Sequence, residues 1–123
     1  LKLVLGGPEV PVGSYARAMF MRLGVLGPAE ANVVSNEEDV KAVVSKVRLG
    51  EADAGVVYRT DVTSEVEGDL KVIEVPRAAS PLAVYPMAAL EGAPNPEGAR
   101  DFVNLVDSQA GSRVLRGYGF GLP

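Results

Sequence analysis

The sequence predicts an α/β domain in which helices flank a layered, largely parallel sheet. Short apolar runs typical of buried strands alternate with amphipathic segments of helical periodicity. Glycine and proline punctuate the boundaries between these segments. Because parallel strands need a long crossover connection, usually a helix, this alternation favours a parallel sheet over an antiparallel one.

The chain opens with a predicted strand and a predicted helix. Residues 1–5 form an apolar run that Gly6-Gly7-Pro8 closes, which is typical of a buried strand followed by a turn. Residues 14–23 carry apolar side chains at helical spacing, and Gly24 is expected to end that helix. No cleavable signal pattern precedes the first strand, so we expect the chain to begin inside a longer protein.

A second strand, helix and strand are expected next. Residues 32–34 are a short strand candidate, and Ser35-Asn36-Glu37-Glu38 is a capping-box pattern for a helix that ends at Gly50. Valines on one face of that helix indicate the side that packs on the core. Residues 54–58 form the next predicted strand.

The last third is predicted to contain two strands and then two helices. Residues 71–75 are one strand candidate, and residues 82–90 are a longer one whose Pro86 confines it to an edge or ends its pairing. Pro96 opens a predicted helix, and residues 108–116 form the final one.

Composition limits the function classes. A chain of 123 residues, 47% hydrophobic and 23% charged, is typical of one globular domain with a packed core. The net charge of −4 argues against a nucleic-acid or anionic-membrane surface, but local backbone dipoles can still hold a small anion. There are no cysteines or histidines, which removes thiol chemistry, Cys/His zinc sites and histidine bases.

Three short motifs follow one another along the chain. They are Pro8-Glu9-Val10-Pro11-Val12-Gly13-Ser14-Tyr15-Ala16, Glu37-Glu38-Asp39-Val40 and Gly50-Glu51-Ala52-Asp53-Ala54-Gly55-Val56-Val57-Tyr58. Their order and spacing, with the closing Tyr118-Gly119-Phe120, resemble the second lobe of periplasmic molybdate-binding proteins, the capture subunits of molybdate ABC importers. The resemblance covers nearly the whole chain, and it implies that roughly half of a two-lobe family member lies outside it.

The resemblance also implies a division of the chain. Residues 1–81 would form the second, anion-binding lobe of a two-lobe periplasmic-binding-protein fold. Residues 82–123 would supply a crossing strand and C-terminal helices that complete the missing first lobe. Because no first lobe is present to receive this segment, we expect two copies to pair through it as a homodimer.

Tyr58 has two interpretations. From the pattern alone it is a tyrosine at the end of a strand, with its ring half packed and its hydroxyl at the surface. The resemblance instead implies that its hydroxyl donates to an oxygen of the molybdate. An uncharged O–H donor suits that task, because several neutral donors can hold a dianion reversibly.

Val40 and Val12 also have two interpretations each. Val40 on its own is a core valine, and Val12 belongs to a turn in which Gly13 relieves strain. The resemblance implies that the backbone N–H of each valine meets the anion at a helix start. For Val40 this requires the helix cap to lie at Asn36 or Glu37, because with Ser35 as the cap the Val40 N–H is used within the helix.

The other charged residues are interpreted as structural. Glu37, Glu38 and Asp39 point in different directions on a helix, so we expect first-turn acids rather than metal ligands. The arginines are expected to be solvated, since no block of like charge occurs. They are Arg17, Arg22, Arg48, Arg59, Arg77, Arg100, Arg113 and Arg116.

The resemblance implies an oxyanion-binding lobe of an ABC-importer substrate-binding protein, with Val12, Val40 and Tyr58 as donors to molybdate or tungstate. It implies a permease partner, a periplasmic or extracellular location, and neither a cofactor nor a catalytic residue. Two alternatives stay open: the effector-sensing lobe of a transcription regulator, and an interaction or scaffold domain without ligand. An enzyme is the least favoured class, since no nucleophile–base pair or metal cluster is present in the sequence.

Overall fold

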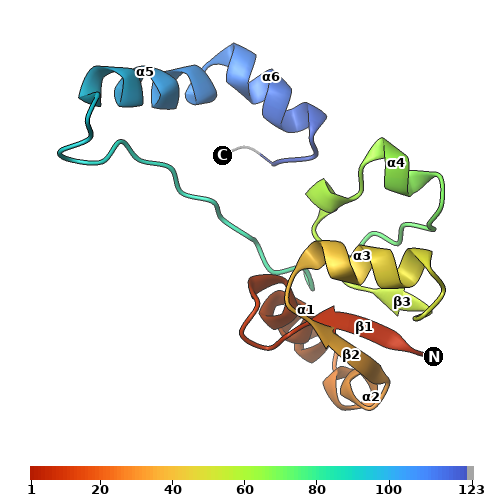
Figure 1. The fold of residues 1–123 in the computed structure, drawn as a ribbon. Helices are drawn as coiled ribbons and strands as arrows, with labels where there is room; N and C mark the ends of the chain where they lie inside the picture. The colour runs from red at the N-terminus through yellow and green to blue at the C-terminus, as the bar shows by residue number, and fades with distance from the viewer. Residues whose placement is uncertain (122–123) are drawn as a thin grey trace. The chain divides into compact units, whose positions relative to one another are not determined.

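The structure is a computed structural model that describes residues 1–121, and it consists of two compact units. The first is Leu1–Ala83 and the second begins at Val84 (Figure 1). The assignment of residues 1–81 and 82–123 to different lobes stays a prediction. Each unit is described here by itself.

A three-stranded parallel sheet organises the first unit. Its strands are β1 (Leu3–Gly6), β2 (Val33–Glu37) and β3 (Ala54–Gly55), in the order β2-β1-β3. All four residues of the central strand β1 are buried, since β1 has a neighbour on each side and helices over both faces. The predicted α/β class and the parallel sheet are both confirmed.

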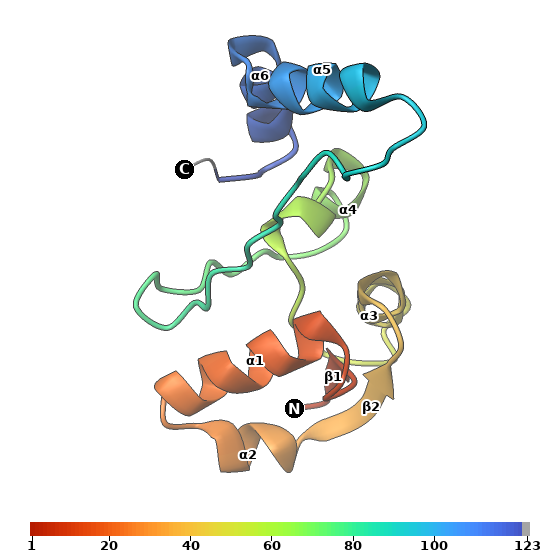
Figure 2. The same cartoon turned by 90° about the vertical axis from the view of Figure 1, so that its left-hand side faces the viewer.

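The helices of the first unit cover the two faces of the sheet. They are α1 (Pro11–Arg22), α2 (Leu26–Glu30) and α3 (Val40–Arg48), and Figure 2 shows α1 and α3 on opposite sides of β1. Right-handed crossovers require this, because the chain steps from β1 to β2 in one direction and from β2 to β3 in the other.

The core forms where α3 meets β1. Val4 and Val43 are fully buried and cluster with Ala52, and removing side chains of this size from water contributes roughly 1.5–3 kcal/mol each. Leu5, next to Val4 along the strand, faces the other layer, where Met19 of α1 is buried.

Two of the predicted helix ends are confirmed. Gly24 follows α1 with φ of 72°, and Gly50 follows α3 with φ of 73°, a region that glycine adopts without strain. The start of α1 was predicted too late. The helix begins at Pro11, because proline at the first helical position loses no hydrogen bond.

The predicted start of α3 is wrong. Ser35-Asn36-Glu37 belongs to β2, and α3 begins only at Val40. Ser35 pairs with Val4, and Glu37 pairs with Gly6. The capping-box pattern is locally valid, but pairing with the central strand prevails over it.

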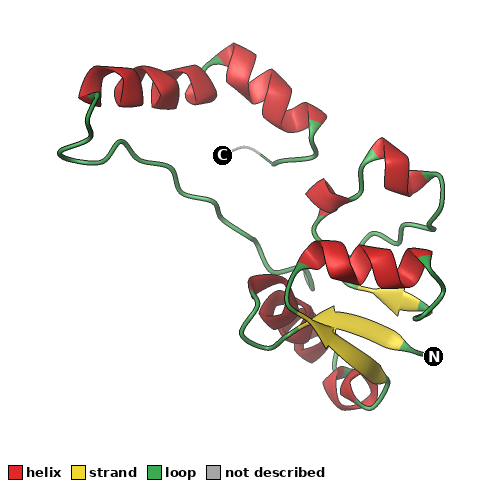
Figure 3. Cartoon of the chain, in the orientation of Figure 1, coloured by secondary structure: helices red, strands yellow, loops and turns green. Residues whose placement is uncertain are grey.

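Three predicted strands are absent or shortened in the structure. Within residues 1–121, the segments 71–75 and 82–90 are loops, as Figure 3 shows, and β3 is two residues long instead of extending to Tyr58. A strand needs a partner for its N–H and C=O groups, and these segments have none among the described residues. A short 3₁₀ turn (Arg59–Asp61) and helix α4 (Ser64–Glu67) were not predicted.

The second unit is a helical pair, as predicted. It contains α5 (Pro96–Asp107), capped by the Asn95 side chain, and α6 (Gln109–Gly117), capped by Ser108. Phe120 lies edge-on to Tyr85 with ring centroids 5.9 Å apart, while Tyr118 is exposed. Within residues 1–121, no helix has both the length and the apolar composition that crossing a membrane requires.

Replacing Gly13 with alanine is expected to lower the free energy of unfolding by about 1–3 kcal/mol, because a Cβ there overlaps the carbonyl groups of Gly6 and Gly7. Urea denaturation, followed through the unfolding transition of the first unit, measures the change in the free energy of unfolding. Gly27→Ala is the matched control, since Gly27 lies in α2 with open space around it. Equal stability of the two variants would contradict the close approach of α1 to β1.

Candidate functional site

The carboxyl ends of the three strands meet at one edge of the sheet. The chain leaves β1 for α1, leaves β2 for α3 and leaves β3 toward Tyr58, and all three exits lie at this edge because the strands are parallel. The order β2-β1-β3 also makes this edge a topological switch point. Open α/β sheets bind their ligands there, in the crevice between loops that diverge.

The start of α1 lies close against the end of β1. Val10 is the extended residue before the helix, Pro11 is the first helical residue and Val12 the second. The Val12 N–H therefore belongs to the first turn, where N–H groups have no acceptor within the helix. Its side chain is buried. The alternative interpretation, a turn in which Gly13 relieves strain, is wrong, because Val12 and Gly13 both belong to α1.

The cap of α3 lies later than Asn36 or Glu37, where the interpretation of Val40 as a donor placed it. Asp39 is the N-cap, and its Oδ1 accepts a hydrogen bond from the Ala42 N–H at 2.9 Å. Val40 is the first residue of the helix, so its N–H lies in the first turn and points out of the helix start. The side chain is half-buried, which fits the core interpretation of the valine.

Tyr58 follows β3 in an extended conformation. Both its ring and its backbone make contacts with neighbouring residues. Its ring lies edge-on to that of Tyr15 on α1, with centroids 6.2 Å apart and planes at 71°. Its N–H donates to Asp61 Oδ2 at 3.0 Å, and its carbonyl accepts from the Asp61 N–H at 3.1 Å. The direction of the Tyr58 side chain is thus fixed by a helix on one side and a tight turn on the other.

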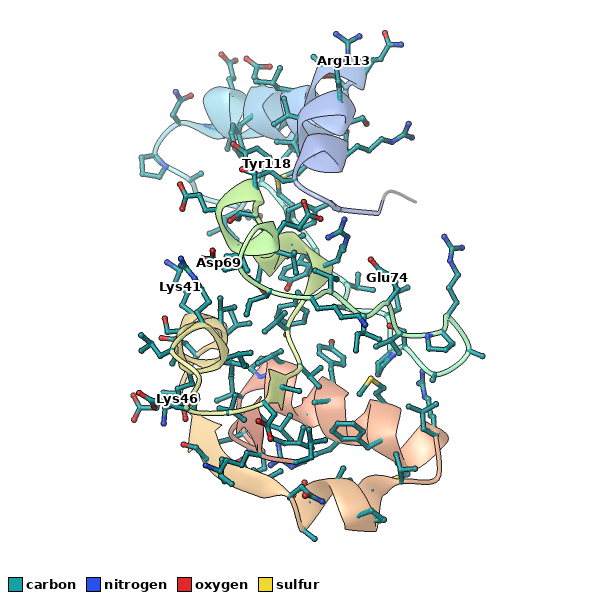
Figure 4. The ribbon with its side chains drawn as sticks, turned by 90° about the vertical axis from the view of Figure 1, so that its right-hand side faces the viewer. Lys41, Lys46, Asp69, Glu74, Arg113 and Tyr118 are labelled. Atoms are coloured by element: carbon teal, nitrogen blue, oxygen red, sulfur yellow. The ribbon has the colours of Figure 1, made fainter. Side chains whose placement is uncertain are left out.

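Asp61 is a residue that the sequence prediction missed. Burial raises the pKa of its carboxyl, while the Tyr58 N–H and the charge of Lys41 act in the opposite direction. Lys41 is the second residue of α3 and is labelled in Figure 4. The sequence signal for the 3₁₀ turn at Arg59–Asp61 is the acidic residue three positions after Tyr58, which follows β3.

These contacts connect the three predicted donors. Tyr15 lies one turn after Val12 on α1, and its ring packs edge-on to that of Tyr58. Lys41 lies next to Val40, and its charge acts to lower the pKa of Asp61. Val12, Val40 and Tyr58 therefore stand on elements that meet at the same edge of the sheet. That they bind an anion stays a prediction.

The prediction that Arg17 is solvated is wrong. Its side chain is 19% exposed, and its guanidinium donates to Gly6 O at 2.9 Å, to Gly13 O at 3.1 Å and to Asn36 Oδ1 at 2.8 Å. Its Nε lies 2.7 Å from Glu30 Oε1. Thin spacing of arginines along the chain does not reveal that one of them is surrounded by acceptors from four elements.

The acidic motif is also used differently from the prediction. Glu37 lies in β2, where it accepts hydrogen bonds from the Ser35 hydroxyl and, at 2.9 Å, from Lys46 of α3. These two donors, the serine first, hold the pKa of Glu37 below its ordinary value. Asp39 caps α3, and none of the acids lies in the first turn of that helix.

The donor set at this edge is neutral. Among residues 1–121, no group of three or more acidic side chains gathers in a way that would hold a metal ion. First-turn N–H groups and a tyrosine hydroxyl can each donate a hydrogen bond, and an oxyanion needs hydrogen-bond donors. The edge is suited to hold a small anion by hydrogen bonds.

Comparison with known proteins connects this chain to one family and to several relatives. The family described as "Bacterial extracellular solute-binding protein" matches residues 1–121. The chain is 38% identical over 123 residues to the "Molybdate-binding protein ModA" of Mycobacterium tuberculosis, covering 100% of this chain and 45% of that protein. It is 32% identical over 120 residues to the ModA of Haemophilus influenzae, covering 96% of this chain and 46% of that one.

A solved structure agrees with these relatives. The "substrate binding domain of putative molybdenum ABC transporter from Clostridium difficile" superposes with a TM-score of 0.80 at 28% identity, covering 96% of this chain and 51% of that chain. This likeness confirms the predicted periplasmic-binding-protein fold. The chain spans about half the length of the relatives it matches.

Glu37→Gln is expected to lower the free energy of unfolding by about 1 kcal/mol at pH 7, because a charge-assisted pair with Lys46 is lost. A lowered folded-state pKa means that the stabilisation is present above pH 4.5 and is lost as the pH falls through the folded pKa. Denaturant titrations at pH 7 and at pH 3 measure it. The difference in the free energy of unfolding between wild type and Glu37→Gln should be smaller at pH 3 than at pH 7. Glu38→Gln, at the exposed neighbouring residue, is the control. A gap that widens on acidification would contradict the assignment.

Proposed function

Because the chain belongs to the bacterial extracellular solute-binding proteins, we propose that it is the lobe that supplies part of a binding site for a tetrahedral oxyanion, molybdate or tungstate. The observation that carries this proposal is the convergence of two helix starts and one tyrosine at a single sheet edge. The relatives named as molybdate-binding proteins support the choice of anion.

Each donor has a separate role. The N–H groups of Val12 and Val40 meet two anion oxygens from two directions, since α1 and α3 start from different strands. The Tyr58 hydroxyl donates to a third position, which depends on the ring contact with Tyr15. All three donors are uncharged, so binding commits no buried counter-charge and stays reversible.

The electrostatics of the edge favour an anion in spite of the acidic composition. Each helix start carries roughly +0.5 of an elementary charge from aligned peptide dipoles, and two such starts face the same edge. The net charge of −4 is spread over the surface, where solvent and salt screen it. The local dipoles therefore decide the sign of the ligand.

The protein acts as a carrier, without a catalytic residue or cofactor. A second lobe, encoded outside these residues, closes over the anion and supplies the remaining donors. The closed protein then delivers its anion to the permease of an ABC importer outside the cytoplasmic membrane. One relative, 32% identical, is named as a putative ABC transporter substrate-binding lipoprotein of Bacillus subtilis, which supports this partner and location.

Tyr58→Phe, made in the protein as its natural reading frame encodes it, is expected to weaken molybdate binding about tenfold or more. The ring contact with Tyr15 and both backbone bonds to Asp61 remain, and a hydroxyl donor to a charged acceptor, worth about 1.5–3 kcal/mol, is lost. Isothermal calorimetry gives the dissociation constant and a thermal melt checks the fold. The control is Tyr118→Phe, at an exposed tyrosine of the second unit. An unchanged dissociation constant with an unchanged melting temperature would exclude Tyr58 from the site.

Residues 1–123 alone are expected to bind molybdate weakly at best. Without a closing lobe the donors compete with bulk water, and each hydrogen bond then contributes only about 0.5–1.5 kcal/mol net. Calorimetry on this chain, compared with the whole protein, measures the difference. Sub-micromolar affinity from a monomer of the chain would refute the requirement for a second lobe.

A further inference from the structure

We propose that Arg17 is the positioning residue of the oxyanion site, and that its guanidinium sets the spacing between the two helix starts that carry Val12 and Val40. This inference rests on the function proposed above. Arg17 lies in the middle of α1. Its side chain extends toward the carboxyl edge of the sheet, where it donates a hydrogen bond to Gly6 O at the end of β1.

The contacts of Arg17 come from the segments whose placement matters for the donors. Its Nη1 donates to Gly6 O, the end of β1, and to Gly13 O, which belongs to the residue after Val12. Its Nη2 donates to Asn36 Oδ1 near the end of β2, the strand that leads into Val40. One rigid plane thus holds the end of β1, the first turn of α1 and the end of β2.

Only arginine can make this connection. The guanidinium is a planar fork with five donors, so it bridges acceptors that lie in different directions, whereas the ammonium of lysine is a single point on a flexible stem. A shift of one helix start relative to the other would take one N–H out of reach of an anion that the other still holds.

The role of Arg17 is geometric rather than that of a counter-charge for the anion. Glu30 Oε1 lies 2.7 Å from Arg17 Nε, so the positive charge of the guanidinium is already compensated within the protein. Its remaining N–H groups are directed at carbonyl and amide oxygens. A substitution that keeps the charge but loses the fork therefore separates the two roles.

The test is Arg17→Lys in the protein as its natural reading frame encodes it, titrated with sodium molybdate by calorimetry at 25 °C, with a thermal melt of each variant. We expect the variant to be folded at 25 °C and to bind molybdate at least about tenfold more weakly, the lower end of what losing an outer-shell partner costs a metal site. Arg48→Lys is the matched control, because Arg48 lies in the last turn of α3 and pairs with Asp69 at the surface. Its affinity should equal that of the wild type.

Each result decides one claim. A folded Arg17→Lys variant that binds as tightly as wild type overturns the positioning role, whereas a wild type that does not bind molybdate overturns the proposed function itself. If Arg17→Lys does not fold, Asn36→Ala decides instead, because it removes one exposed acceptor of the guanidinium. Weaker molybdate binding with an unchanged melting temperature supports the role, and wild-type affinity overturns it.

Discussion

The parallel pairing of β1 with β2 on one side and β3 on the other is the constraint on which the rest of this structure depends. It buries β1 completely, and it requires crossovers that place α1 and α3 on opposite faces of the sheet. It also brings the three strand exits to one edge. The residues just after β2 and those just after β3 therefore both lie beside the residues just after β1.

That arrangement accounts for the anion site proposed for this acidic chain without histidine. Helix starts carry unpaired N–H groups and the positive ends of peptide dipoles, and neither depends on side-chain charge. Of the cations near the edge, Arg17 is paired with Glu30 and Lys46 with Glu37, while the charge of Lys41 acts on the Asp61 carboxyl. The three proposed donors are neutral, which suits the reversible binding proposed for this lobe.

Much of the fold could be predicted from local patterns. Glycines at positions 24 and 50 and the proline at 96 mark predicted helix boundaries because their backbone preferences are intrinsic. Pro11 carries the same signal, although that helix was predicted only from residue 14. The placement of Val12, Val40 and Tyr58 after strands also follows from the sequence. Their convergence needed the strand order, which periodicity does not encode.

The errors have a common physical origin. Ser35 has every local feature of a helix cap, yet pairing with β1 makes it part of a strand. Segments 71–75 and 82–90 have strand-like composition, yet no partner strand is present among the described residues. Arg17 looked unremarkable because its acceptors come from four separate elements. In each case long-range contacts determined the outcome.

The central claim is that one anion is held jointly by the Val12 N–H, the Val40 N–H and the Tyr58 hydroxyl. A crystal structure of the protein grown with molybdate, with anomalous diffraction recorded at the molybdenum edge, tests it most directly. We predict a single strong anomalous peak at the carboxyl edge of the sheet, with oxygens within hydrogen-bonding distance of all three donors. A peak bound elsewhere on this lobe, or at that edge but out of reach of these donors, would contradict the proposal.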